Sequence, residues 1–439
     1  MNGPLLLLAA AILGALVGCL TGLLPGLHVN TLSVVLLAFA PLGYGAMSAI
    51  GVASDLVPIT LAALLLGITI SHTFVNIIPA TYLGAPDEST ALSILPAHRL
   101  LLRGDGYRAV AISAYASYGA VALSLVCFWP AEWVLVRAAP AIKAATPALL
   151  VLLVAFLVHR EPGRLGPEAW PAAMRRFLAR MAAFDLFLAA GLFGLVSFQL
   201  NYRALVPLPP SPLLPALGGL FGAATLLEAL AQHARVPHQF LRMGQGRVAP
   251  AGAAASLAAG VAAGAGMSLF PGLTNATATA VATAARKGTD EEVLVSLGAV
   301  NTANAVFNLL VLALFDHARS GAVVALRELL PVESWTGPVP AQLVWFLFAT
   351  LAGAFVSLVA TLALGRWAAR RIHAVPYRRL VVGVLVYVTL VAWLFTGWTG
   401  LAVFAVGTAL GLLTVRLGLQ RTHLTGVLLV PVLGYFWLA

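Results

Sequence analysis

The sequence predicts an all-α, polytopic membrane protein built from two inverted repeats. Each repeat is expected to contain a helical hairpin broken at a Pro-Gly pair and about five transmembrane helices. Composition is the first reason: 61% of the 439 residues are hydrophobic and 9% are charged, whereas about 25% of a soluble domain is charged. The second is that Pro-Gly-Leu occurs twice, at residues 25–27 and 271–273, each time inside a long apolar segment. The third is an uneven distribution of Lys and Arg between the loops that this topology creates.

A membrane-spanning helix needs about 20 mostly apolar residues. The two broken segments cover residues 4–42 and 250–285. The unbroken spans are expected near residues 57–80, 108–130, 145–158, 181–200, 205–232, 291–316, 341–364, 379–396, 398–416 and 423–438. This order assigns residues 1–232 to the first inverted repeat and 250–439 to the second, with residues 233–249 as a cytoplasmic linker.

The two Pro-Gly pairs are predicted hinges. Pro25 and Gly26 form the first pair, and Pro271 and Gly272 the second. Proline lacks a backbone donor and glycine frees the backbone, so each pair breaks a membrane helix. Broken apolar segments at corresponding positions of two halves are the best indication in a sequence of a transporter's binding site.

The basic residues predict the orientation. If each broken segment returns to the face from which it enters, 20 of the 25 Lys and Arg residues lie on one side of the membrane. The other side holds Arg137, Lys143, Arg203, Arg319 and Arg327. If each segment instead crosses once, the two sides receive nearly equal numbers. The positive-inside rule therefore favours hairpins, with the Arg-rich loops in the cytoplasm and both termini extracytoplasmic. Five spans separate the hairpins, so the second repeat is inverted and the two tips can meet near the midplane.

Both hairpin tips carry polar residues but no carboxylate. Hydroxyl, amide and imidazole groups, together with N–H groups freed at a helix start, suit an anion such as a carboxylate or a phosphate. The alternative is that these side chains only satisfy the broken backbone. The predicted substrate-binding residues of the tips are His28, Asn30, Thr31, Thr274, Asn275 and Thr277.

The span after each hairpin is also unusually polar. His72 and Asn76 share one helical face in the first half, and Asn301, Asn304 and Asn308 share one face in the second. Polar residues are costly inside a membrane and normally face a partner or a cavity. We expect His72, Asn76, Asn301 and Asn304 to contact substrate, with hydrogen bonding between helices as the alternative.

Two acidic residues follow the first polar span. Asp87 and Glu88 are candidates for binding a coupling Na⁺ or H⁺, although this loop could equally cap an amphipathic helix over residues 91–102. Neither a metal site nor any other cofactor is expected, because the two cysteines, Cys19 and Cys127, both lie in apolar segments.

The motifs at residues 22–28 and 269–273 resemble the duplicated Pro-Gly hairpin motifs of the tripartite tricarboxylate transporter large permease family, and most closely its shorter, archaeal-type branch. The Gly-Ala-Pro-Asp-Glu sequence at residues 84–88 adds to this resemblance. The resemblance implies secondary transport of carboxylates driven by an ion gradient. It also implies a small membrane subunit and an extracytoplasmic binding protein as partners.

The sequence thus predicts an ion-coupled permease that moves an organic carboxylate across the cytoplasmic membrane by alternating access, with the ligand between the two tips. The alternative is a translocase for polyprenyl phosphate or another lipid phosphate, since its hairpins would offer the same donors. An enzyme is not expected, because no paired carboxylates, His-His metal spacing or nucleophile–base set occurs at matched depth. The expected partners also include membrane lipids and further copies of the chain. Nucleic acid is excluded, because the Arg-rich loops are explained by topology and anionic lipid.

Overall fold

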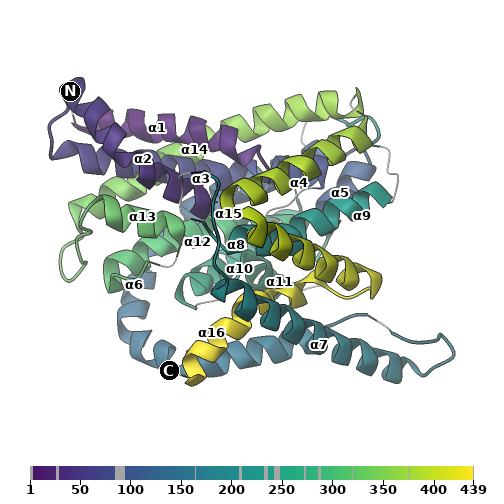
Figure 1. Ribbon diagram of the computed structural model, residues 1–439. Helices are drawn as coiled ribbons and strands as arrows, with labels where there is room; N and C mark the ends of the chain where they lie inside the picture. Colours follow the sequence, from purple (N-terminus) through teal and green to yellow (C-terminus); the bar gives the residue numbers. More distant parts are fainter. Residues whose placement is uncertain are drawn as a thin grey trace.

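The computed structural model describes residues 3–25, 29–84, 94–163, 165–206, 210–231, 236–241, 248–270, 273–284, 288–318, 320–374 and 376–438. Every regular element within these residues is a helix (Figure 1). Nine of the helices in this part of the chain are long and apolar enough to cross a membrane. The prediction of an all-α, multi-pass membrane protein is confirmed.

Helices follow one another along the chain, and the described segments contain no strand. The first half contains α1 (Gly3–Gly22), α2 (Val29–Ala49), α3 (Leu56–Val75), α4 (Ile77–Leu83), α5 (Ile94–Leu102), α6 (Gly106–His159), α7 (Ala172–Gln199), α8 (Leu213–Leu217), the π-helix η2 (Gly218–Ala223) and α9 (Ala224–Ala231). The second half contains α10 (Pro250–Leu269), α11 (Asn275–Ala284), α12 (Asp290–Phe315), α13 (Gly321–Leu329), α14 (Ala341–Arg371), η3 (Ile372–Ala374), α15 (Tyr377–Arg416), η4 (Arg421–Thr425) and α16 (Gly426–Leu438).

Helices α1 and α3 pack side by side and run in the same direction. Gly3 lies beside Leu56 at the start of both helices, and Gly18 approaches the backbone of Ile68 further along. A Cβ atom on Gly14 would collide with the carbonyl oxygen of Leu64, so only glycine allows this close approach. Because α1 and α3 start at the same end, α2 must carry the chain back between them. The first broken segment is therefore a hairpin, as the sequence predicted.

Helices α10 and α12 repeat this arrangement. Gly252 lies beside Glu292 at the start of the pair, and Gly264 approaches the carbonyl oxygen of Val300 further along both helices. The two helices are therefore also parallel, and α11 returns the chain between them. The second broken segment is a hairpin as well.

The second pair runs opposite to the first. α5 follows the far end of α3 and α4, and Arg99 of α5 forms an ion pair with Asp290, the first residue of α12. α12 therefore starts where α3 and α4 end. α6 starts at this same end and runs parallel to α12, because Arg108 pairs with Glu291 at 3.2 Å and Ser117 donates to the carbonyl of Gly298 at 3.3 Å.

Two predicted pairs of spans each lie within one long helical element, continuous in α6 and broken once in α15. The predicted spans 108–130 and 145–158 both lie in α6, so the prediction of a break between them is wrong. Three prolines within α6, Pro130, Pro140 and Pro147, remove backbone donors without ending the helix. In Figure 1, α6 descends on the left and then turns along the lower edge. A straight helix of this length would span about 80 Å, well beyond one membrane crossing.

The other pair, predicted at residues 379–396 and 398–416, lies in α15. Here the helix is interrupted at Gly397, which has φ 67° and ψ −160°, a conformation open only to glycine. The predicted separation between these two spans is thus present as a sharp break. The helices in the predicted span 205–232 begin later than expected, because α8 begins at Leu213. The helix in the predicted span 423–438 also begins later, because α16 begins at Gly426.

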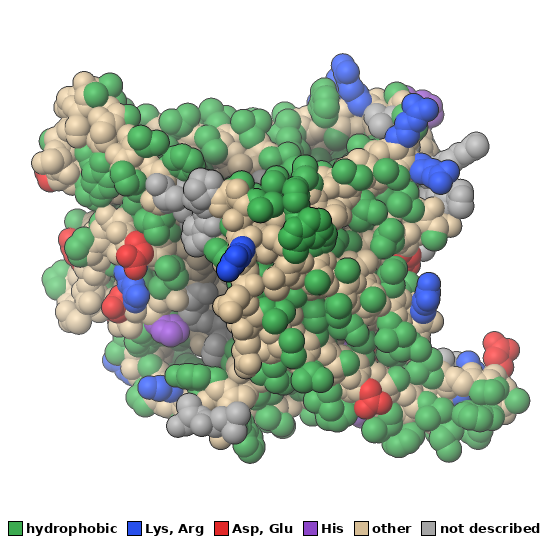
Figure 2. Space-filling view, viewed as in Figure 1, with side chains coloured by type: hydrophobic (Ala, Val, Ile, Leu, Met, Phe, Trp, Pro, Cys, Tyr) green, Lys and Arg blue, Asp and Glu red, His purple; other side chains and the backbone are tan. Residues whose placement is uncertain are grey.

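Helices α7, α8, α9, α15 and α16 form a second layer beside the core of α1, α3, α6, α10, α12 and α14. Gly194 of α7 approaches the carbonyl oxygen of Val427 in α16, and Gly219 of η2 approaches that of Phe404 in α15. Hydrophobic side chains dominate the face seen in Figure 2, and the Lys and Arg side chains lie mainly toward its margins. The N and C labels both lie on the left of Figure 1.

A buried hydrogen bond between His423 and Glu161 fixes the turn before α16. His423 Nε2 lies 2.7 Å from Glu161 Oε2, and both side chains are fully buried. Burial raises the pKa of Glu161, but the hydrogen bond with His423 and those from the N–H groups of Gln420 and Gly163 outweigh it. The pKa of Glu161 therefore lies below its ordinary value. η4, which carries His423, also contacts α11, so this pair supports the second hairpin.

The glycine contact between α1 and α3 gives a first prediction. Gly14→Ala places a methyl group against the carbonyl of Leu64 and should lower the free energy of unfolding by about 2 kcal/mol, as overpacking does. Gly45→Ala is the matched control, because no atom lies within 4 Å of the added Cβ in α2. Thermal unfolding of the purified variants in detergent measures both. Equal stability of the two variants would contradict the packing described for α1 and α3.

The pair of Glu161 and His423 gives a second prediction. A lowered folded-state pKa contributes stability that is complete above the unfolded-state pKa of about 4.3 and is lost as the pH falls through the folded-state value. Glu161→Gln should therefore lower the free energy of unfolding by about 2 kcal/mol at pH 7 and by less at acidic pH. Glu168→Gln, in the same loop but exposed, should have no effect. If the free energies of unfolding of Glu161→Gln and the parent chain differ by the same amount at every pH, Glu161 is not charged in the folded protein.

Candidate substrate-binding site

The first hairpin tip is described only in part. Pro25 is buried at the end of the turn after α1, and Gly26 and His28 lie outside the described residues. Asn30 and Thr31 lie in the first turn of α2, but their side chains are also outside the description. The predicted roles of these residues therefore stay predictions.

The end of α1 next to the first tip contacts the polar part of α3. Thr21, in the last turn of α1, places its hydroxyl oxygen 3.4 Å from Nδ1 of His72. Two residues earlier in α1, Cys19 Sγ lies 3.0 Å from the hydroxyl oxygen of Ser71. Thr21 was not among the predicted site residues; its only signal in the sequence is a polar side chain among Gly14, Gly18 and Gly22, which precede the first tip at four-residue spacing.

The second tip is closed by a reciprocal cap. α10 ends at Leu269 and α11 begins at Asn275, with Pro271 and Gly272 outside the described residues. The N–H of Thr274 donates to the hydroxyl of Thr277 at 2.9 Å, and the N–H of Thr277 donates to the hydroxyl of Thr274 at 3.1 Å. Two of the N–H groups at this helix start are thus capped by threonine side chains. Those of Asn275 and Ala276 remain as first-turn donors without a side-chain cap among the described residues.

A chain of amides joins this tip to both polar spans. Asn275 donates through Nδ2 to Oδ1 of Asn301 in α12 at 2.8 Å, and Asn301 donates through Nδ2 to the carbonyl of Thr73 in α3 at 3.4 Å. Asn275 is 7% exposed and Asn301 is 5% exposed, so water does not compete for these bonds. The structure brings together the second tip and the polar spans of both halves. The carbonyl of Thr73 had no signal in the sequence, because any residue supplies one.

The polar faces of α3 and α12 each carry two side chains four residues apart. In α3, His72 and Asn76 are both buried. α3 ends beside Asn76 because Pro79 has no N–H to donate to the carbonyl one turn earlier. In α12, Asn308 is buried and donates through Nδ2 to Oδ1 of the half-buried Asn304 at 3.3 Å. These bonds fit the alternative of helix-to-helix hydrogen bonding as well as substrate contact.

Several buried oxygen atoms in this region have no hydrogen-bond partner among the described residues. They are Oδ1 of Asn275, Oγ1 of Thr279, Oγ1 of Thr302 and Oδ1 of Asn308. Buried polar groups in native proteins almost always have a partner. These four oxygen atoms are therefore open to hydrogen bonds from a ligand or from water.

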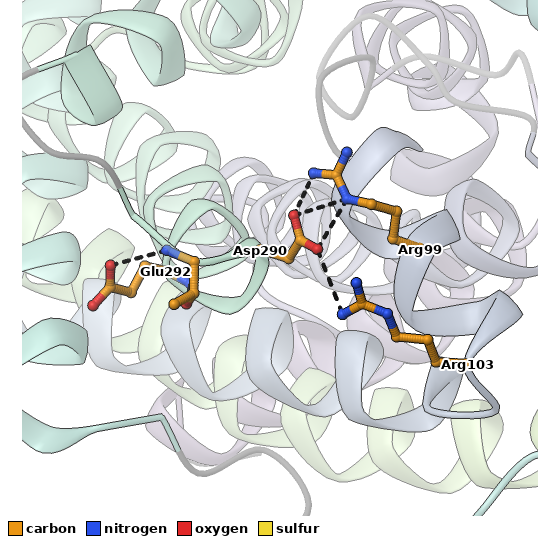
Figure 3. Close-up of polar contacts among 5 residues, drawn as sticks. Arg99, Arg103, Asp290 and Glu292 are labelled. Atoms are coloured by element: carbon orange, nitrogen blue, oxygen red, sulfur yellow. Dashed lines mark hydrogen bonds and ion pairs between the residues drawn. The ribbon is translucent and has the colours of Figure 1, made fainter.

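Charged side chains gather at one end of this region. Figure 3 shows the Arg99 and Arg103 side chains directed at the carboxylate of Asp290. Arg99 Nε lies 2.9 Å from Asp290 Oδ2, and Arg103 lies 4.0 Å from it. The hydrogen bond to Asp290 raises the pKa of Arg99. Partial burial lowers this pKa, but by less. At the same helix start, Thr289 and Glu292 form a capping box.

These ion pairs join α5 of the first half to α12 of the second. Asp87 and Glu88, the candidate ion-coupling residues, lie outside the described residues. Within the described ranges, no group of three or more His, Cys, Asp or Glu side chains could hold a metal ion.

Two parallel helix pairs inside an apolar helical bundle, α1 with α3 and α10 with α12, are joined by buried amides, an arrangement typical of multi-pass membrane transporters. The family model "Tripartite tricarboxylate transporter TctA family" matches residues 8–426, and the chain belongs to this family. This confirms the family resemblance and the prediction of a permease rather than an enzyme. An uncharacterised protein of Methanocaldococcus jannaschii is 25% identical over 436 residues, which cover 97% of this chain and 98% of that protein. No solved structure matches the chain.

The amide chain gives a third prediction. Asn275→Ala and Asn301→Ala should each destabilise the protein, and their effects should not add, because both remove the same hydrogen bond. A double-mutant cycle measured by unfolding in detergent should yield an interaction free energy of about 1 kcal/mol. Strictly additive effects would show that the two amides do not interact.

Proposed function

We propose that the protein is an ion-coupled permease that moves an organic carboxylate across the cytoplasmic membrane by alternating access. The observation that carries the proposal is the amide chain from Asn275 through Asn301 to Thr73, buried where the second hairpin meets α3 and α12. Membership of the TctA family adds the substrate class, a tricarboxylate or a related anion. It also favours a carboxylate over a lipid phosphate.

The ligand is held between the two hairpin tips. The start of α11 offers the N–H groups of Asn275 and Ala276 and the positive end of a helix dipole, which suits one carboxylate group. His72, Asn76 and Asn304 line the facing polar spans and supply further donors. His28, Asn30 and Thr31 complete the site from the first tip in this proposal, and the Pro-Gly pairs act as its hinges.

The architecture that supports this mechanism is a pair of inverted repeats, residues 1–232 and 250–439. α1 and α3 run parallel to each other and opposite to the parallel pair of α10 and α12, as inversion requires. Such repeats allow one tip to open while the other closes, in two states of similar energy. The Arg-rich end that carries Arg99, Arg103 and Arg108 faces the cytoplasm, and both termini face outward.

Partners follow from the family and complete the proposal. The tripartite arrangement implies a small membrane subunit and an extracytoplasmic binding protein that delivers the anion. Asp87 and Glu88, in the loop that follows α4, are candidate groups for the coupling Na⁺ or H⁺.

Ligand-dependent thermal stabilisation tests the substrate class. Purified protein is heated with citrate, shorter dicarboxylates, phosphate or polyprenyl phosphate, each with and without sodium. A ligand at about 100 times its dissociation constant should add about 2.7 kcal/mol. We expect stabilisation by a soluble carboxylate, lost in Asn275→Ala and kept in Asn201→Ala, a matched change in an exposed loop. Stabilisation by polyprenyl phosphate alone would contradict the proposal.

A further inference from the structure

The direction of the amide chain fixes which atom is left over at the second hairpin tip. The backbone carbonyl of Thr73 can only accept, so the group of Asn301 that faces it must be Nδ2. Oδ1 of Asn301 then faces Asn275, which must donate with its own Nδ2. The remaining atom of the Asn275 amide is therefore an oxygen, and it has no partner among the described residues.

A second oxygen lies one helical turn along the same face of α11. Thr279 follows Asn275 by four residues, so the two side chains lie one above the other. Thr279 is fully buried, and its hydroxyl oxygen also has no partner in the described part of the chain. Thr283, the next residue on this face, differs because its hydroxyl already donates to the carbonyl of Thr279 at 2.8 Å.

The chemistry of this pair differs from that of the helix start. One amide hydrogen of Asn275 and one of Asn301 are used in the amide chain, and the hydroxyls of Thr274 and Thr277 are used in the cap. Uncharged oxygen atoms in a buried, apolar setting are ligands for a hard cation. In membrane transporters with broken helices, Na⁺ is bound by oxygen atoms next to the break.

We propose that Asn275 Oδ1 and Thr279 Oγ1 are ligands of a sodium ion bound at the second hairpin. The inference rests on the proposed function, because it assigns the coupling ion of that permease to a site free of carboxylates. It assigns the ion to neither Asp87 nor Glu88, the acidic candidates in the sequence.

The position of this site explains how ion and substrate are coupled. The N–H groups at the start of α11 favour an anion, and the ion lies within one turn of them. Bound alone, the sodium ion is disfavoured by the positive end of the α11 dipole, and the carboxylate by the apolar interior. When both are bound, their opposite charges compensate each other. Sodium therefore raises the affinity for the carboxylate, and by linkage the carboxylate raises the affinity for sodium to the same extent.

Sodium binding to the full-length protein without substrate tests the inference. Thermal stability in detergent is titrated with sodium chloride, replacing choline chloride or potassium chloride at constant ionic strength. The parent chain should show saturable stabilisation by sodium alone. Thr279→Val, which keeps the shape and removes the oxygen, should weaken the apparent affinity for sodium by about tenfold or more.

Two variants are the controls for this titration. Thr279→Ser restores the oxygen and should restore the affinity. Thr283→Val makes the same chemical change one turn away, where the hydroxyl is already bonded, and should leave the affinity for sodium unchanged. An unchanged affinity in Thr279→Val would overturn the inference. So would the loss of sodium binding only in Asp87→Asn or Glu88→Gln.

The same preparations separate this inference from the proposed function. If citrate stabilises the parent chain and sodium has no effect with or without it, the sodium site is wrong and the carboxylate permease stands. If sodium binds through Thr279 and no carboxylate stabilises the protein, the substrate class is wrong and the ion site stands.

Discussion

The hydrogen bonds from Asn275 through Asn301 to the carbonyl of Thr73 connect the parts of this protein that must act together. They cross from the second hairpin to α12 and from α12 to α3, so they link the two halves of the chain. In an apolar interior an unpaired amide is costly, and a bond to a neighbouring helix offsets that cost. The same bonds set the orientation of each amide and so decide which atoms are free to bind a ligand.

Glycine packing places these amides within reach of one another. α1 lies against α3, and α10 against α12, at separations that a single methyl group would disturb at Gly14, Gly18 or Gly264. Without a hydrophobic driving force between helices in lipid, such close contacts are a main source of association. They hold the polar faces of α3 and α12 in a fixed position.

Much of this arrangement could be predicted from the sequence. The two Pro-Gly pairs predicted the hairpins, and the isolated amides of α11 and α12 predicted a buried polar region. The continuity of α6 could not be predicted, because the prolines that bend it look the same in a sequence as prolines that end a helix. The role of Thr73 could not be predicted either, because its backbone carbonyl accepts from Asn301 only when α3 packs against α12. The pair of Glu161 and His423 joins loops 262 residues apart in the chain and had no local signal.

An experimental structure of the protein in lipid nanodiscs with citrate and sodium chloride tests the central claim most directly. The account predicts that citrate lies between the start of α11 and the polar faces of α3 and α12, in contact with Asn275 and within reach of His72. It also predicts an ion beside Thr279. Citrate bound elsewhere, with Asn275, Asn301 and His72 making no contact to it, would show that the buried amides only hold the helices together.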